Sequence, residues 1–413
     1  MHKHERKSGK KGIIALILAL LVVGGAGAVF ALSGCSSDEG EGTKPADQAD
    51  EAAAESGEEE NTAEDEKEPE EKEPVDTVQV KIDELMSGMT LEEKVGQMFI
   101  ARCPDVDAAA AVEQYKPGGY ILFGRDFSGK SKQEIVNNIA GYQAAAKTPM
   151  FIGVDEEGGT VNRVSLNPSL RAVPFWAPRD LYASGGMDLI KSDTEEKCEL
   201  LKSLGINLNF APVCDISTNP SDFMYKRSFG GTPEATADFV ETVVNVMNEE
   251  RVGSVLKHFP GYGNNSDTHT GIAYDNRSIN TFNASDFIPF DGGIKAGASM
   301  VLVSHNVVNC MDPESPASIS AKVHEILRTQ LGFDGVVITD DLAMEGVKQF
   351  AGDTEIAVRA VQAGNDLLCC TEFKTQIPAV IDAVNAGTIS EERIDESVER
   401  ILKLKIELGI IEA

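Results

Sequence analysis

The sequence predicts one α/β domain, a (β/α)8 barrel of the TIM type, behind an export signal and an acidic linker. Two observations support this fold. Eight short, mostly apolar runs alternate with amphipathic stretches between residues 77 and 413, as repeated β-α units require. Polar residues also follow most of these runs, as they do at the carboxyl ends of barrel strands. A doubly wound open sheet is the alternative, and the length leaves no room for a second folded domain.

The predicted strands are short runs bounded by turn or helix signals. They cover residues 98–101, 119–123, 150–154, 208–213, 252–256, 300–303, 336–339 and 366–369. Helical periodicity between and after them predicts helices at 133–147, 232–250, 320–331, 354–363 and 391–408. Several of these stretches are followed by Gly, which commonly ends a helix.

Residues 1–35 predict a lipoprotein-type signal peptide. Basic residues precede an uncharged apolar stretch at 13–32, and the stretch ends in Leu32-Ser33-Gly34-Cys35. These four residues resemble a bacterial lipobox, which implies cleavage before Cys35 and lipid attachment to its thiol. The apolar stretch of about 20 residues could also span a bilayer uncleaved. Either route predicts an exported protein tethered to the outer face of a bacterial cytoplasmic membrane.

Residues 36–76 predict a disordered acidic linker, because they contain 18 Asp or Glu, 3 Lys and almost no large apolar residue. The remaining residues, 77–413, carry a formal charge of −19 out of −30 for the whole chain. Such an acidic surface argues against nucleic acid or a bare anionic membrane as a partner of the folded domain.

The cysteines after Cys35 lack the paired spacing of zinc or iron–sulfur ligands, and most lie in apolar or strand-like contexts. Their spacing therefore predicts no zinc or iron–sulfur site, and we also predict no other metal site and no organic cofactor.

Polar residues cluster after five of the predicted strands, where a barrel forms its active site. The third strand is followed by Asp155-Glu156-Glu157-Gly158-Gly159 and then Arg163, the fourth by Asp215 and Lys226-Arg227, the fifth by Lys257-His258, the sixth by Ser304-His305-Asn306 and the seventh by Asp340-Asp341. An Asp after a strand often only caps the next helix. Five such clusters together favour a site instead.

Asp267 and His269 lie two residues apart in a segment rich in Asn and Ser after the fifth strand. At this spacing the carboxylate can accept a hydrogen bond from the imidazole and orient it, which predicts an acid/base pair on a loop. A surface loop that happens to carry polar residues is the plain alternative, and the preceding Lys-His-Phe-Pro-Gly run argues against it.

At this point the chain resembles glycoside hydrolase family 3, in its β-N-acetylglucosaminidase branch. The matching segments follow the family order over about residues 80–410, and they read Met89-Thr90-Leu91-Glu92-Glu93-Lys94-Val95-Gly96-Gln97, Asp155 to Gly159 with Val161-Asn162-Arg163, Phe210-Ala211-Pro212-Val213 with Arg227-Ser228-Phe229-Gly230, Lys257-His258-Phe259-Pro260-Gly261, Asp267-Thr268-His269, and Ile338-Thr339-Asp340-Asp341-Leu342.

The resemblance implies a role for each matching residue. Asp340 corresponds to the nucleophile, and His269 to a general acid/base held by Asp267. Since neighbouring strand residues point to opposite faces, only one of Asp340 and Asp341 should reach the barrel axis. The positions that hold the ring hydroxyls of N-acetylglucosamine in the family correspond to Asp155, Arg163, Arg227, Lys257 and His258.

The chain departs from many relatives in the fifth loop, where Tyr262 replaces a His and the stretch from Gly263 to Asp267 is one residue shorter. This loop carries His269, so its geometry bears on the leaving-group subsite.

These features predict a retaining β-N-acetylglucosaminidase that releases terminal β-linked N-acetylglucosamine from peptidoglycan fragments or chitin-type oligosaccharides. Two alternatives stay open: a phosphorylase with the same site, because a neutral imidazole does not repel phosphate, and a non-catalytic sugar-binding lipoprotein. A β-glucosidase is less favoured, since those relatives take their acid from a further domain.

Overall fold

The computed structural model describes residues 76–412. The predicted signal peptide with Cys35, and the linker up to residue 75, lie outside the described residues. Asp76, the last residue of the predicted linker, accepts hydrogen bonds from the backbone N–H groups of Val78 and Gln79 and so caps the first helix.

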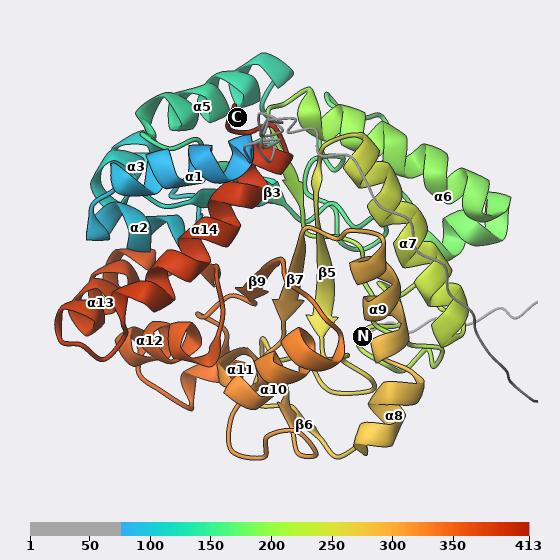
Figure 1. The fold of residues 1–413 in the computed structure, drawn as a ribbon. Coiled ribbons are helices and arrows are strands. Elements are labelled where there is room, and N and C mark those ends of the chain that lie inside the picture. Colours follow the sequence, from blue (N-terminus) through green and yellow to red (C-terminus); the bar gives the residue numbers. More distant parts are fainter. Residues whose placement is uncertain (1–75, 413) are drawn as a thin grey trace, which may run out of the picture. The chain divides into compact units, whose positions relative to one another are not determined.

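Eight parallel strands form the barrel, and helices surround them (Figure 1). The strands are β1 (Phe99–Arg102), β2 (Gly119–Leu122), β3 (Phe151–Val154), β4 (Leu208–Asn209), β5 (Gly253–Phe259), β7 (Met300–Val303), β9 (Val336–Thr339) and β10 (Leu368–Cys370). They pair in the order β10-β1-β2-β3-β4-β5-β7-β9. A parallel bridge between Ile338 and Leu367 joins the two outer strands of that order and completes the ring. The predicted (β/α)8 fold is therefore confirmed.

The helices follow the strands in sequence, as β-α units demand. They are α1 (Thr77–Ser87), α2 (Leu91–Gln97), α3 (Ala108–Tyr115), α4 (Gly124–Phe127), α5 (Lys132–Ala145), α6 (Pro178–Lys202), α7 (Pro233–Glu249), α8 (Ile279–Ala284), α9 (Phe287–Lys295), the 3₁₀ helix η1 (Ala317–Ile319), α10 (Ala321–Glu325), the π-helix η2 (Ile326–Gln330), α11 (Glu345–Lys348), α12 (Asp353–Ala363), α13 (Phe373–Asn385) and α14 (Glu391–Glu407).

Local sequence signals explain where several helices begin and end. Thr90 and Ser131 start α2 and α5 as capping boxes with Glu93 and Glu134. Gly364 ends α12 at a φ of 115°, which a residue with a side chain rarely adopts.

Two strand boundaries were predicted wrongly. The fourth strand was expected at 208–213 but is regular only over β4, because Pro212 has no N–H to donate to a neighbouring strand. The fifth strand was expected to end at Leu256, yet β5 continues to Phe259. Lys257 and His258 remain in the strand because buried carboxylates pair with them, as described below.

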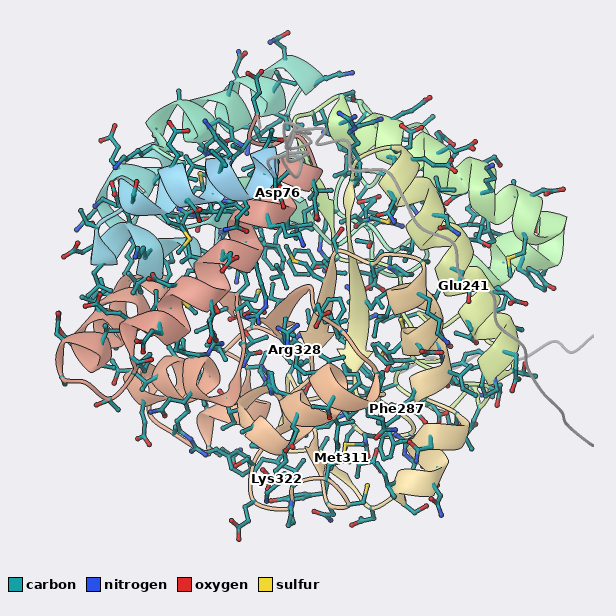
Figure 2. All side chains as sticks on the ribbon, in the orientation of Figure 1. Asp76, Glu241, Phe287, Met311, Lys322 and Arg328 are labelled. Carbon is teal, nitrogen blue, oxygen red and sulfur yellow. The ribbon has the colours of Figure 1, made fainter. Side chains whose placement is uncertain are left out.

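Apolar side chains of the strands and of the inner helix faces form one core. Phe287, at the start of α9 (Figure 2), belongs to this core. Its ring stacks on that of Phe259 in β5, with the ring centroids 5.7 Å apart. Among residues 76–412, no helix is long and apolar enough to cross a membrane.

A second, two-stranded sheet lies in the loops. It pairs β6 (Tyr274–Asp275) with β8 (Val307–Val308). Because β6 ends the loop that follows β5, this pair fixes that loop to the one after β7. The pair was not predicted, since two-residue strands leave no periodic pattern in a sequence.

Candidate functional site

Most of the predicted site residues lie at or just beyond the carboxyl ends of the barrel strands. Asp155 follows β3 and Asp340 follows β9, whereas Lys257 and His258 lie near the carboxyl end of β5. Arg227 comes from the long segment after β4. The topology thus brings residues more than 180 positions apart in sequence to one end of the barrel.

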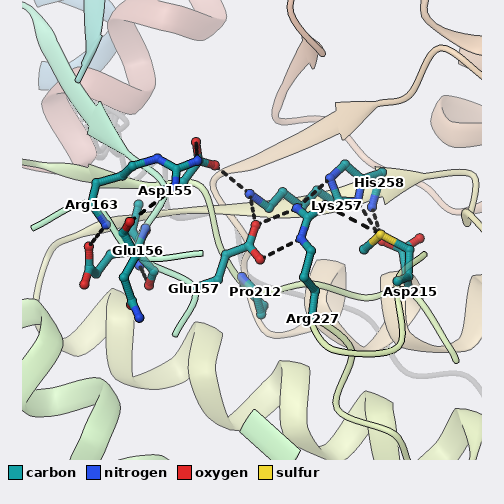
Figure 3. A network of polar contacts seen from close by, with 12 residues as sticks. Asp155, Glu156, Glu157, Arg163, Pro212, Asp215, Arg227, Lys257 and His258 are labelled. Carbon is teal, nitrogen blue, oxygen red and sulfur yellow. Dashed lines mark hydrogen bonds and ion pairs between the residues drawn. The ribbon is translucent and has the colours of Figure 1, made fainter. Parts of the chain in front are cut away.

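An ion network connects β3 to β5 (Figure 3). The Nζ atom of Lys257 lies 2.8 Å from Asp155 Oδ1 and 2.6 Å from Glu157 Oε1. Arg227 binds the same Glu157 carboxylate in a bidentate manner, with Nε–Oε2 and Nη2–Oε1 distances of 2.9 and 2.7 Å. Arg163 approaches from the other end, 3.7 Å from Asp155 Oδ2. The predicted binding residues are therefore held by one another and by Glu157.

Burial and charge oppose each other in this network. Burial alone would favour the neutral acid of Glu157, but the nearby Arg227 and Lys257 cations hold the pKa of that carboxyl far below its usual range. Burial would likewise lower the pKa of Lys257, but Asp155 and Glu157 raise it above its ordinary value. Glu157 and Lys257 are accordingly both charged near neutral pH.

His258 is oriented by Asp215. The Nδ1 atom of His258 lies 2.6 Å from Asp215 Oδ2, and its backbone N–H donates to the same oxygen. On the opposite side of the ring, Nε2 lies 3.2 Å from Nη2 of Arg227. Since guanidinium nitrogens can only donate, this contact assigns the Nε2 lone pair as acceptor and the ring proton to Nδ1. His258 is thus held in a fixed orientation by Asp215 and Arg227.

Glu156 shapes the loop that carries Arg163. Its carboxylate is fully buried and accepts hydrogen bonds from the backbone N–H groups of Arg163, Val164 and Ser165. These contacts fold the segment after β3 back over the end of the strand. They also fix the backbone at Arg163, and with it the direction of the Arg163 side chain.

The two adjacent aspartates after β9 have different surroundings. The Asp341 carboxylate accepts hydrogen bonds from the N–H groups of Ala343 and Thr371 and from the Thr371 hydroxyl, so it holds two loops together. Among the described residues, the Asp340 carboxylate accepts only the N–H of Asp341, at 2.9 Å. Asp340 is therefore the one of the two whose carboxylate is left available for a ligand.

Electrostatics favour the ionised form of Asp340. Burial opposes ionisation, but the histidines around the carboxylate, first His305 and then His258, and the N–H of Asp341 outweigh it and hold the pKa of Asp340 below its ordinary value. Burial at the same time lowers the pKa of His305. The hydrogen bond from the Asp341 N–H is the contribution that does not depend on the charge of a histidine.

Asp267 and His269 form the predicted pair on the loop after β5. Nδ1 of His269 lies 2.7 Å from Asp267 Oδ1, and the His269 backbone N–H donates to the same oxygen. The His269 side chain is 63% exposed, so its Nε2 edge is free to meet a substrate. His269 also contributes, after His305 and His258, to the lowered pKa of Asp340.

Tyr262 ties this loop to the rest of the site. Its hydroxyl accepts the N–H of Thr268 at 2.8 Å and lies 2.9 Å from the Thr268 hydroxyl. Its own backbone N–H donates to Asp215, the residue that also orients His258. The residue that departs from many relatives is therefore a buried anchor between Asp215 and the segment of Asp267 and His269.

Three residues that organise the site were not predicted as site residues: Glu157, Asp215 and Tyr262. The first two were noted as polar residues after strands, and only the folded distances reveal which cations or imidazoles they contact. Within residues 76–412, no group of three or more His, Cys, Asp or Glu could hold a metal ion. The six cysteines of this part of the chain are free thiols, and all but Cys310 are buried.

Comparisons with known proteins agree with this architecture. Residues 90–404 match the family described as the glycosyl hydrolase family 3 N terminal domain. A beta-hexosaminidase of Xanthomonas campestris is 35% identical over 261 residues, which are 62% of this chain and 78% of the relative.

Solved structures give the same result. A glycoside hydrolase family 3 beta-N-acetylglucosaminidase from Paenibacillus matches with a TM-score of 0.73 and 34% identity, over 78% of this chain and 63% of its own. A beta-N-acetylhexosaminidase from Beutenbergia cavernae matches with a TM-score of 0.69 and 26% identity, over 76% of this chain and 98% of its own.

Proposed function

Because this chain belongs to glycosyl hydrolase family 3 and is a glycoside hydrolase, we propose that it is a retaining β-N-acetylglucosaminidase. Its substrates are oligosaccharides that end in β-linked N-acetylglucosamine. The curated beta-hexosaminidases and the solved beta-N-acetylglucosaminidase to which it is similar support this substrate class.

The observation that carries the mechanism is the ionised carboxylate of Asp340, which only the N–H of Asp341 engages among the described hydrogen bonds. In the first step this carboxylate attacks C1 of the sugar, the glycosidic C–O bond breaks, and protonated His269 gives its proton to the leaving oxygen. In the second step His269 takes a proton from water, the hydroxide oxygen adds to C1, and the ester bond to Asp340 breaks.

The other predicted residues hold the sugar. Lys257 Nζ uses two of its three N–H groups on Asp155 and Glu157, which leaves one for a ring hydroxyl. Asp155 supplies carboxylate acceptors beside Lys257 and Arg163. Asp267 keeps the His269 ring directed so that Nε2 faces the leaving oxygen.

We propose peptidoglycan fragments as the natural substrates ahead of chitin-type ones. The predicted lipoprotein signal with Cys35 supports this order, because a protein tethered outside a bacterial cytoplasmic membrane would meet cell-wall fragments first. A sugar-binding lipoprotein without activity is disfavoured, since binding needs neither a nucleophile nor an acid.

The test is the stereochemistry of an early product. Hydrolysis of 4-nitrophenyl β-N-acetylglucosaminide followed by proton NMR should give the β-anomer of the free sugar first, and an Asp340→Asn variant should lose at least about three orders of magnitude in kcat. An initial α-anomer would contradict the retaining mechanism. Sugar 1-phosphate as the main product when phosphate is added would instead identify a phosphorylase.

A further inference from the structure

The loop that carries Asp267 and His269 is held through Thr268, the residue between them. Thr268 is buried, whereas His269 is exposed. The N–H of Thr268 donates to the Tyr262 hydroxyl at 2.8 Å, and its carbonyl oxygen accepts the N–H of Gly346 at 2.9 Å. Thr268 is thus fixed from two sides, by Tyr262 of its own loop and by Gly346 of the segment after β9.

The hydrogen bond from Gly346 acts on the peptide unit that leads into His269. Because a peptide unit is planar, the direction of the Thr268 carbonyl also fixes the direction of the His269 N–H. That N–H donates to Asp267 Oδ1 at 2.9 Å, and the same oxygen lies 2.7 Å from Nδ1 of the imidazole. Gly346 therefore holds one side of the peptide unit whose other side takes part in the acid/base pair.

The position of Gly346 follows from that of the strand that ends beside the proposed nucleophile. Gly346 lies on α11, six residues after Asp340. The segment between them is anchored through Asp341, whose carboxylate and carbonyl oxygens accept the N–H groups of Ala343 and Met344. The contact of Gly346 with the loop therefore ties the proposed acid/base to the backbone of the proposed nucleophile.

This contact leaves no room for a side chain at position 346. A Cβ atom added to Gly346 would lie 2.9 Å from the Thr268 carbonyl oxygen, 3.0 Å from Thr268 Cβ and 3.2 Å from the Gly271 carbonyl oxygen. Two of these atoms belong to the backbone on either side of His269, so no change of rotamer moves them away. Gly346 does not adopt a positive φ, so the close approach of the two segments, and not the local backbone conformation, calls for glycine.

We propose that Gly346 is a positioning residue for proton transfer. Its N–H holds the Thr268 carbonyl, and its lack of a Cβ atom lets the loop approach the segment after β9. His269 then stays where it can protonate the leaving oxygen. Gly346 acts through Thr268 and not on the substrate. This inference rests on the proposed function and adds a residue to its acid/base step.

The first test measures kcat/KM of Gly346→Ala on two aryl β-N-acetylglucosaminides whose phenols differ in acidity. The constant kcat/KM reports the step in which the leaving oxygen departs, and 2,4-dinitrophenol departs without a proton, whereas phenol needs one. We expect a loss of about 10- to 100-fold on the phenyl substrate, because a small displacement of the acid is costly. The loss on the 2,4-dinitrophenyl substrate should be less than about threefold. A purely structural defect would lower both constants by the same factor.

Gly352→Ala is the matched control. Gly352 precedes α12 with a φ of −66°, and a Cβ atom added to it would meet no atom within 4 Å. This variant should match wild type on both substrates. Hydrogen exchange of residues 263–270 should quicken in Gly346→Ala, because the added Cβ displaces the Thr268 carbonyl, and should stay unchanged in Gly352→Ala.

A second test keeps Gly346 in place and looks at its own N–H. Tyr262→Phe releases Thr268 from the other side, so hydrogen exchange of the Gly346 N–H should quicken in that variant. Tyr120→Phe, which removes a buried hydroxyl from β2, should leave this exchange as in wild type.

Two outcomes would overturn the inference. One is a loss in Gly346→Ala that is absent on the phenyl substrate or equal on both substrates. The other is exchange of the Gly346 N–H that does not change in Tyr262→Phe. If wild type hydrolyses neither substrate, the proposed function fails, and hydrogen exchange still decides whether Gly346 holds the loop.

Discussion

The carboxylate of Glu157 bridges two cations of the site, with Oε1 lying 2.6 Å from Lys257 Nζ and 2.7 Å from Arg227 Nη2. This residue comes two positions after Asp155 and is almost fully buried. Because it is shared, one side chain sets the distance between the cation from β5 and the cation from the segment after β4.

Replacing Glu157 by Gln should therefore disturb binding and stability together. Loss of the charge leaves two buried cations with one anion fewer, which costs about 3–5 kcal/mol of unfolding free energy at pH 7. The pKa of Glu157 is depressed on folding, so its contribution is present above the ordinary carboxyl pKa and is lost as the pH falls. Urea unfolding at pH 7 and pH 4 should show the difference between wild type and variant shrinking at the lower pH.

Glu113→Gln is the control, because Glu113 is exposed on α3 and should change stability by less than about 0.5 kcal/mol. We also expect a larger rise in KM than fall in kcat for Glu157→Gln. An unchanged KM would contradict the view that Glu157 positions the sugar-binding cations.

The loop that carries His269 should loosen when Tyr262 is changed to Phe. The substitution removes the hydroxyl that accepts the Thr268 N–H, and leaves that buried N–H unpaired at a cost of about 1–3 kcal/mol. Hydrogen exchange in residues 263–270 should quicken, and kcat should fall about tenfold because His269 is less well placed.

Tyr120→Phe is the matched control for this experiment. Tyr120 is also buried, and its hydroxyl donates to the Ala108 carbonyl. It lies on β2, which is three strands away from β5 in the barrel. If both variants speed hydrogen exchange of residues 263–270 to the same extent, the Tyr262 hydroxyl does not specifically restrain the loop.

Removal of the Asp267 carboxylate should affect substrates according to their leaving groups. Asp267→Ala takes away the acceptor that orients His269, so proton transfer becomes less efficient. We expect kcat to fall by about 10²- to 10³-fold for a disaccharide, whose leaving oxygen needs a proton, and much less for the 4-nitrophenyl substrate. Equal losses on the two substrates would rule out a role of the dyad in protonating the leaving group.

The buried Lys405 should make the free energy of unfolding depend on pH in an unusual way. It is buried on α14, where its Nζ atom donates to Gln97 Oε1 at 2.7 Å, and burial lowers the pKa of Lys405 to about 7. An unfolded lysine has a pKa of about 10.4, so between these values the unfolded chain holds a proton that the folded chain lacks. Stability should rise with pH in this window by up to about 1.4 kcal/mol per pH unit.

The test compares the free energy of unfolding of two variants, each with one lysine of α14 changed to Met. Lys405→Met should be more stable than wild type at pH 7, and the gap should close as the pH approaches 10. The exposed Lys403→Met should show no such trend relative to wild type. A gap for Lys405→Met that stays constant from pH 7 to 10 would mean that Lys405 keeps its proton in the folded state.

The fold could be predicted from the sequence because the same pattern, an apolar run followed by a helical stretch, is repeated along the chain. Eight apolar runs separated by helical periodicity indicate a barrel even when single boundaries are wrong, as they were at Pro212 and at the end of β5. Only interactions between distant segments decide that Lys257 and His258 stay in the strand. The burial of their side chains depends on carboxylates contributed by β3 and by the segment after β4.

The site residues that were not predicted are those without a local sequence motif. Asp340, Asp267 and His269 follow from motifs, whereas Glu157 and Asp215 resemble ordinary acidic residues after strands. Their importance lies in the partners they meet, and no local pattern encodes a contact across 70 or 43 residues of chain.

During turnover, Asp340 should become esterified to C1 of an amino sugar. The most direct test is to treat the protein with a fluorinated N-acetylglucosaminyl fluoride that forms the glycosyl-enzyme faster than it is hydrolysed, and to map the adduct by peptide mass spectrometry. We expect one sugar per chain, on the peptide that contains Asp340, and none on the Asp340→Asn variant. An adduct on another carboxylate, or no adduct under conditions of rapid turnover of ordinary substrates, would rule out Asp340 as the nucleophile.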